Sequence, residues 1–344
     1  MVAPGGAVPG GTITISGTGF SPTPSQNTVT FNGVAGTVVS ASAIQLMVTV
    51  PAGATTGPLV VTTPAGSDTS DTFTVGASAP AVSGFAPAVG TPGTAVAITG
   101  SNFETAPTNN KLRFNLATAA ISAATASTLG TTVPSTATSG RLTLTTPEGT
   151  GQSAADFFVP PAGFAAADVM ATGRLDLGGA SLPVTIGTAD KIALAVFDGT
   201  AGQQVSLGMS AVSIGISDVT IFRPEGTTLA SLGWVVSSGE SLVMTLPVAG
   251  TYQILVDARP FYSGSMTLTL SEDLQGSIAS GGASVPVSLT RPGQRARLTF
   301  SGTAAQQVSL GLTAATVGSG VSLVAPDGTT VASGGYGTTP AAPG

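Results

Sequence analysis

The sequence contains no cysteine and no histidine. Disulfide bonds, zinc fingers, cysteine nucleophiles and histidine-based catalytic triads are therefore excluded. Charged residues make up only 8% of the chain, with 10 Lys and Arg against 16 Asp and Glu, whereas about 25% is usual. Because no basic cluster is available to displace counterions from phosphates, we expect no binding to nucleic acid and none to an anionic membrane surface.

Long apolar runs are also missing. No run approaches the roughly 18 residues that a membrane-spanning helix requires, so we expect no membrane insertion. The first residues, MVAPGGAVPGG, lack a basic region followed by an apolar core, and so do not form a signal peptide. We expect this sequence to be a fragment of a larger protein.

The chain is rich in residues that suit strands and turns. Hydrophobic residues make up 42% of it, and 47 Gly and 24 Pro punctuate it. Ile13 and Ile15 alternate with threonines, and Ile44, Leu46 and Val48 alternate in the same way. This period of two is typical of strands buried on one face, with Gly/Pro/Asn/Ser turns about every 8–12 residues as in β-sandwiches. Gly19 and Gly33 lie where turns need a positive φ.

The first half of the chain carries one set of motifs twice. ISGTGF at 15–20 recurs as ITGSNF at 98–103, and VPAGATTGPLVVTTPAG at 50–66 recurs as VPSTATSGRLTLTTPEG at 133–149. Both pairs have the same offset of 83 positions (98 − 15 and 133 − 50). A constant offset without a gap predicts two copies of one domain.

These copies, at residues 1–76 and 79–160, resemble the IPT/TIG family of immunoglobulin-like domains. TITISGTGF, NTVTFNG and VTVPAGATTGPLVVTTPAG carry the resemblance, and LATAA at 116–120 departs from the expected turn. The resemblance implies an Ig-like β-sandwich. It also implies an extracellular or cell-surface bacterial location, because the family occurs in bacterial surface proteins, although a fold does not decide a function.

The second half carries another repeat. GTAGQQVSLGM at 199–209 recurs as GTAAQQVSLGL at 302–312, an offset of 103 positions (302 − 199). We expect both stretches to be core strands that direct Val205 and Leu207, or Val308 and Leu310, to the interior. The third and fourth modules would then span the ranges 167–273 and 274–344, after a linker at 159–166. The fourth lacks counterparts of TYQILV and SMTLTL.

These two modules resemble bacterial pre-peptidase C-terminal (PPC-like) β-sandwich domains. ADKIALAVF, the GTAGQQVSL strand, DVTIFRPEGTTLAS and LPVAGTYQILV carry the resemblance. The fold class predicted for the whole chain is therefore all-β, as tandem β-sandwiches: two Ig-like, then two PPC-like, the last truncated. Such an order of domains resembles the non-catalytic parts of large bacterial surface or YD-repeat-type proteins.

We find no motif for catalysis. The carboxylate pairs Glu272 with Asp273 and Asp168 with Asp176 are interpreted as solvated charges. No phosphate-binding glycine loop is present, so we expect no cofactor and no catalytic residue.

Calcium remains the most plausible metal. The loops of the third module could gather Asp190, Asp198 and Asp218, since Ca²⁺ prefers oxygen ligands. The spacing matches no known calcium loop, and we predict no metal site.

Exposed aromatic side chains are candidate ligand platforms, since their faces stack on the apolar faces of sugars. Phe261 and Tyr262, in ARPFYSGS, are predicted at a hairpin tip and are the candidate platform. For Trp234, the single Trp, packing is the favoured interpretation. The phenylalanines shared by the first two copies are interpreted as core: Phe20, Phe31, Phe73, Phe103, Phe114 and Phe157.

Two hypotheses follow for function. The first is a non-catalytic spacer, adhesion or interaction segment of a larger secreted or cell-surface protein, with a protein or a glycan as partner. The alternative is a carbohydrate-binding accessory region of an extracellular enzyme. An enzymatic role for this segment itself is not expected.

Overall fold

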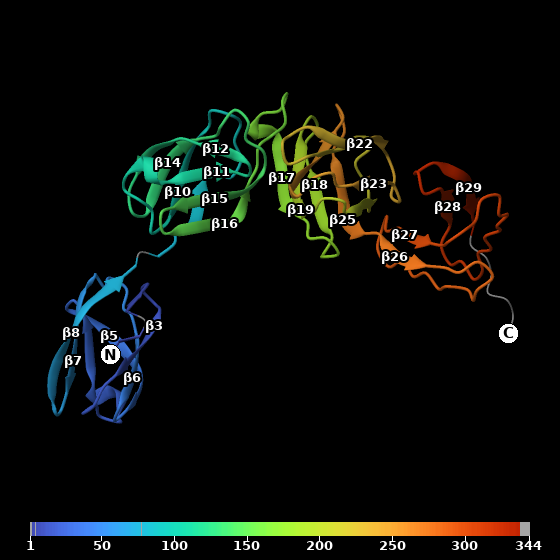
Figure 1. Cartoon of the computed structure of the whole chain (residues 1–344). Coiled ribbons are helices and arrows are strands. Elements are labelled where there is room, and N and C mark those ends of the chain that lie inside the picture. The colour runs from blue at the N-terminus through green and yellow to red at the C-terminus, as the bar shows by residue number, and fades with distance from the viewer. Residues whose placement is uncertain (1, 4, 77, 338–344) are drawn as a thin grey trace. The chain divides into compact units, whose positions relative to one another are not determined.

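The computed structural model describes residues 2–3, 5–76 and 78–337 of the chain (Figure 1). In these residues the regular structure is β-strand, apart from three single turns of 3-10 helix. The strands form tandem β-sandwiches, which confirms the predicted fold class. Two compact units can be distinguished: residues up to 274 together with 289–295, and the remainder.

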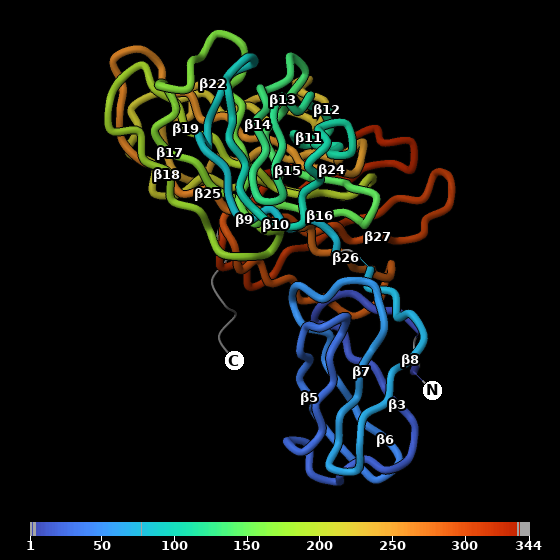
Figure 2. Tube along the Cα trace, turned by 90° about the vertical axis from the view of Figure 1, so that its left-hand side faces the viewer, coloured from blue at the N-terminus to red at the C-terminus, as the bar shows by residue number. Residues whose placement is uncertain are grey.

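The first sandwich has one long strand that belongs to both of its layers. Its strands are β1 (Val2–Ala3), β2 (Gly6–Ala7), β3 (Thr12–Ser16), β4 (Thr28–Phe31), β5 (Val34–Ser42), β6 (Gln45–Thr49), β7 (Gly57–Thr63) and β8 (Gly66–Val75). Residues 34–36 of β5 pair with β4, and residues 37–42 pair with β6. The eight strands therefore form one continuous sheet folded into two layers, as the tube in Figure 2 allows the reader to follow.

The core of this sandwich follows the alternation in the sequence. Ile13, Ile15 and Leu46 are each at most 5% exposed. Ile44 was predicted on the same face as Leu46, but this prediction is wrong: Ile44 lies in the turn before β6 and is 66% exposed. Gly33 has a φ of 90°, so the predicted need for glycine at this turn is confirmed.

The second sandwich repeats this plan. Its strands are β9 (Ala81–Ala86), β10 (Ala95–Ser101), β11 (Lys111–Phe114), β12 (Ala117–Ala119), β13 (Ile121–Ala124), β14 (Thr128–Thr132), β15 (Gly140–Thr146) and β16 (Gly149–Phe157). Strands β12 and β13 occupy the place of β5, but here the crossing strand is interrupted at Ala120, so the two layers are separate sheets. Of the predicted core phenylalanines, Phe20 is only partly buried, and the other five are buried.

The third sandwich consists of a five-stranded and a four-stranded sheet. Its strands are β17 (Val169–Arg174), β18 (Leu182–Ile186), β19 (Ile192–Gly199), β20 (Gln204–Ser210), β21 (Ser217–Phe222), β22 (Thr228–Val235), β23 (Ser241–Thr245), β24 (Gly250–Ala258) and β25 (Gly264–Glu272). The orders are β17-β19-β24-β21-β22 and β18-β25-β20-β23. Strand β22 is therefore an edge of the larger sheet.

Strand β20 is the first copy of the duplicated stretch. Leu207 lies between Leu242 of β23 and Leu270 of β25. Val205, Leu207 and Met209 have no exposed surface. The prediction of a core strand is confirmed for this copy.

The second copy has a different structure, and here the same prediction is wrong. Residues 302–312 form no strand, and Val308 and Leu310 are 42% and 52% exposed. Among the described residues no strand pairs with this stretch, whereas β23 and β25 pair with β20 in the third sandwich. Residues 275–337 contain only β26 (Leu274–Ser277), β27 (Ala296–Thr299), β28 (Ser319–Val324) and β29 (Thr330–Tyr336), in two-stranded sheets.

Arg291 holds the segment 289–295 against the third sandwich. Its guanidinium donates hydrogen bonds to the carbonyl oxygens of Gly179 at 2.7 Å and Leu270 at 3.1 Å. Its Nε also donates to the hydroxyl of Ser271 at 2.9 Å. Pro292 and Gly293 then lie against Gly208, where an added side chain would overlap them. This contact explains why the outward face of β20 is also buried.

The two copies of the duplicated stretch should differ in hydrogen exchange. We expect the amides of residues 205–209 to exchange roughly a thousandfold or more slower than those of residues 308–312, because only the former are paired in a sheet. Exchange followed by mass spectrometry or NMR measures this difference. Equal protection of the two stretches would contradict the pairing described above.

Candidate functional site

A β-bulge near the end of β22 redirects Trp234. Asp218 of β21 faces two residues of β22, Gly233 and Trp234, because the register shifts there. Trp234 has a φ of 59°, in the left-handed region. The left-handed conformation costs an L-residue about 1–2 kcal/mol and is rare for a residue with a bulky side chain.

The bulge is stabilised by a closed set of contacts among three residues. The backbone N–H of Trp234 donates to Oδ1 of Asp218 at 3.0 Å. Arg259 donates to the same carboxylate, from Nε at 3.1 Å and from Nη2 at 3.0 Å. Its guanidinium carbon lies 4.5 Å from the centroid of the Trp234 ring, a cation–π contact. We call these three residues the tryptophan bulge.

The indole of Trp234 is accessible to solvent. The sequence favoured packing for this residue, but that interpretation is wrong: Trp234 is 61% exposed. Arg259 covers its ring from one side. The alternation in SLGWVVSSG carries no sign of the bulge, although the glycine before the tryptophan is a residue that often marks one.

Phe261 and Tyr262 lie in the turn that follows β24. The N–H of Tyr262 donates to the carbonyl of Arg259 at 3.0 Å, with Pro260 and Phe261 at the two central positions. Phe261 has a φ of 76°, as the third residue of a type II turn requires, where glycine is usual. Phe261 is 91% exposed. Tyr262 is 37% exposed, and its ring lies against Gly215. Their role as a ligand platform remains a prediction.

The bulge and this turn lie at the same end of the five-stranded sheet. Ser217, the first residue of β21, pairs with Val235 of β22 on one side and with Ala258 of β24 on the other. We call this region, with Asp218, Trp234, Arg259, Phe261 and Tyr262, the aromatic end of the third sandwich. It combines three exposed aromatic residues, and two of them, Trp234 and Phe261, lie on strained backbone, which is a common property of binding sites.

A second carboxylate lies beside the tryptophan bulge. Asp257 of β24 pairs directly with Asp218 of β21. Burial raises the pKa of Asp257, and the negative charge of Asp218 raises it further. Arg259 opposes this shift. The aromatic end therefore has charges of both signs in close contact.

The other candidate residues are not gathered into a site. Asp198 binds Arg174 at 2.7 Å and accepts a hydrogen bond from Thr251, whereas Asp218 binds Arg259. Within the described ranges, no three acidic residues are close enough to hold a metal ion. Asp168 binds Lys191 at 2.7 Å, a contact that lowers the pKa of this carboxyl.

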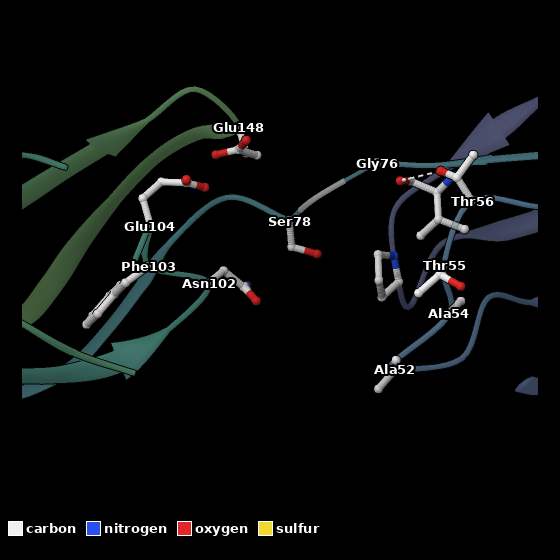
Figure 3. A pocket seen from close by; sticks show the side chains of 13 residues that line it. Ala52, Ala54, Thr55, Thr56, Gly76, Ser78, Asn102, Phe103, Glu104 and Glu148 are labelled. Atoms are coloured by element: carbon white, nitrogen blue, oxygen red, sulfur yellow. Dashed lines mark hydrogen bonds between the residues drawn. The ribbon is translucent and has the colours of Figure 1, made fainter. Parts of the chain in front are cut away.

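A shallow hollow is lined by residues of the first two sandwiches (Figure 3). Glu104 and Glu148 contribute carboxylates to it, and Ser78 and Asn102 add polar groups. Thr56, on its opposite side, exchanges hydrogen bonds with the backbone of Val75. The hollow has no aromatic face that is open to a ligand, so the aromatic end is the stronger candidate.

Comparison with known proteins identifies the first two sandwiches. Residues 3–75 and 80–159 match the IPT/TIG domain family, so the chain contains two IPT/TIG domains, as predicted. No curated protein matches the chain. In the described part of the chain, no helix has the length and apolar character to cross a membrane.

Solved structures show weak similarity. The pre-peptidase C-terminal domain of a Bacillus anthracis collagenase is 12% identical, with a TM-score of 0.24 and coverage of 29% of this chain and 93% of that one. A surface glycan-binding protein of Prevotella bryantii is also 12% identical, with a TM-score of 0.29 and coverage of 78% and 94%. At these values neither similarity assigns a function, and the PPC-like character of the third sandwich stays a prediction.

Replacing Phe261 by glycine should stabilise the protein. Phe261→Gly removes the cost of the left-handed conformation and sacrifices little packing, so we expect the free energy of unfolding to rise by about 1 kcal/mol. Urea denaturation measures this value. Phe261→Ala is the matched control, since alanine keeps the strain and should give no gain. An equal effect of both variants would contradict the assignment.

Replacing Asp257 by asparagine should raise the melting temperature at pH 7. The raised pKa of Asp257 means that the folded state binds its proton more strongly, so stability falls as pH rises through that pKa. Asp257→Asn removes this loss at pH 7 but brings little gain at pH 3, where the carboxyl is protonated. Thermal melts of both proteins at both pH values check this. A gain of the same size at pH 3 would show that the charge is not its cause.

Proposed function

We propose that this chain is a non-catalytic spacer and adhesion segment of a larger secreted or cell-surface bacterial protein. The observation that carries the proposal is the apolar contact between the second and third sandwiches. A spacer must hold successive domains in a fixed orientation and transmit force between them. A flexible linker alone does neither, so the domains must contact each other directly.

This contact is built like a domain core. Phe158, which follows β16, is 6% exposed and packs with Ile192, Leu194 and Val196 on the outward face of β19. Val89 of the second sandwich contacts the same cluster. Because Phe158 and Val89 belong to the second sandwich and the residues of β19 to the third, burial of this cluster stabilises both sandwiches.

A buried ion pair also restrains the orientation of the two sandwiches at this contact. Arg174 of β17 donates from Nε to Asp156 of β16 at 2.8 Å and from Nη1 to Asp198 of β19 at 2.7 Å. The side chains of Arg174 and Asp156 are 17% and 7% exposed. The hydrogen bond that Arg174 donates to Asp156, more than the nearby charges, raises the pKa of Arg174. Such forked pairs fix the orientation of their two partners.

Hydrogen bonds also connect the second and third sandwiches on another side of this contact. Thr138 of the second sandwich donates to the carbonyl of Pro224 at 2.8 Å. Asn115 donates to Thr138 at 3.0 Å and to the carbonyl of Thr251 at 3.4 Å. Asn115 therefore links a turn of one sandwich to a strand of the other. Two IPT/TIG domains and the lack of any catalytic motif agree with a structural role.

The test is whether the two sandwiches tumble as one body in the full chain. We expect NMR residual dipolar couplings of both to fit a single alignment tensor. In the double variant Phe158→Ala/Arg174→Ala they should require two tensors, because the variant removes a buried ring worth about 3 kcal/mol and the ion pair. Leu116→Ala, at a residue 54% exposed in the second sandwich, is the control. Independent tensors in the unaltered chain would overturn the proposal.

A second candidate function is a carbohydrate-binding accessory region of an extracellular enzyme. The exposed rings of Phe261 and Trp234 favour it, because aromatic faces stack on sugars. Binding on a glycan array, lost in Phe261→Ala/Tyr262→Ala, would support this candidate. Folded protein that binds no glycan would count against it.

A further inference from the structure

We propose that the aromatic end of the third sandwich binds a neutral polysaccharide, with the open face of Trp234 as its main stacking surface. This inference rests on the carbohydrate-binding candidate above. It adds two points: which residue contributes most to binding, and that the ligand is uncharged.

The site is organised before any ligand arrives. Trp234 and Phe261 both lie on left-handed backbone, and both are exposed. Phe261 is 91% exposed and gains little packing to offset that cost, so stability does not account for its conformation. The tryptophan bulge fixes the indole through the backbone by way of Asp218 and through the ring by way of Arg259. A ring that is already fixed loses little conformational entropy when a ligand stacks on it.

The geometry fits a pyranose ring. The guanidinium of Arg259 lies over one side of the indole, and Trp234 as a whole is 61% exposed, so a sugar can place its C–H groups on the other face. Among the described residues, neither Nη1 of Arg259 nor Nε1 of Trp234 has a hydrogen-bond partner. Both groups are donors at the border of the apolar face, where the hydroxyls of a stacked sugar would lie.

The charges favour a neutral ligand. An acidic polysaccharide would approach the carboxylates of Asp218 and Asp257, and the nearby guanidinium of Arg259 is already bound to Asp218. A cationic ligand would meet the guanidinium of Arg259 beside the indole. Because like charges repel at close range, Asp218 and Asp257 disfavour an acidic ligand, and the guanidinium of Arg259 disfavours a cationic group stacked on the indole.

The surroundings favour a glycan over a protein. A stable protein interface buries about 800 Å² on each partner around an apolar centre. Here the loops 211–216 and 236–240 adjoin the ends of β21 and β22, and their exposed residues are mainly small or hydroxyl residues, apart from Val236 and Glu240. A few exposed rings on such a surface suit two or three sugar units of a chain.

Because Trp234 is the single Trp of the chain, its fluorescence reports on the site directly. The full chain is titrated with four neutral polysaccharides: hydroxyethylcellulose, glucomannan, galactomannan and dextran. Polygalacturonate and hyaluronate are the acidic probes, and poly-L-proline represents an extended protein segment. We expect at least one neutral polysaccharide to shift the emission to the blue and to protect the indole from acrylamide quenching, and the acidic probes to have no effect.

Affinity electrophoresis in gels with the same polysaccharides tests the residues. We expect Trp234→Ala and Phe261→Gly each to weaken retardation by about tenfold. The glycine variant should be more stable than the unaltered protein, so its loss of binding cannot come from unfolding. Arg259→Lys keeps the charge but loses the planar contact with the indole, and should weaken binding in the same direction. Leu116→Ala, in the second sandwich, should bind as the unaltered chain does.

The outcomes separate this site from the broader candidate. No fluorescence change with any neutral polysaccharide overturns the proposal. Binding of a polysaccharide that is unchanged in Trp234→Ala overturns this site but leaves the carbohydrate-binding candidate standing. Protection by poly-L-proline alone overturns the proposal and assigns the aromatic end to a protein partner.

Discussion

The structure depends on one constraint: an apolar β-strand is stable only when it pairs with a neighbouring strand and a second layer covers its apolar face. The duplicated stretch shows this directly. In β20 the side chains of Val205 and Leu207 are fully buried, since β23 and β25 pair with the strand and the opposite sheet covers it. The second copy has the same alternation, yet Val308 and Leu310 are exposed. The residues are equivalent, and what differs is the presence of their neighbours.

The same constraint shapes the outward face of the five-stranded sheet. A sheet with apolar residues on both faces needs a cover on each, and here the second IPT/TIG domain covers Ile192, Leu194 and Val196. Toward the end of the strands the face changes character. Asp218 and Trp234 replace apolar packing with an ion pair and an exposed ring. One sheet thus supports both the junction proposed to stiffen the segment and the surface proposed to bind a ligand.

Much of the fold could be predicted from the sequence, because repeats and periodicity are local properties. The offset of 83 positions defines the register of two domains, and Phe31 and Phe114 are equivalent core residues, both fully buried. The errors occurred where a residue's environment comes from a distant segment. Ile44 continues the alternation but lies in a turn. Arg291 binds carbonyl oxygens more than a hundred positions away along the chain, a contact that no local pattern indicates.

The sequence by itself determined the fold class, the lack of histidine and cysteine chemistry, and Phe261 and Tyr262 as a candidate surface, because composition and turn residues act over a few positions. Only the tertiary structure decided the state of Trp234. Its exposure depends on a bulge that requires Asp218 on the neighbouring strand and Arg259 directly after β24, the next strand but one. Side chains 16 and 41 positions apart meet there, since the order of strands in a sheet is not the order in the chain.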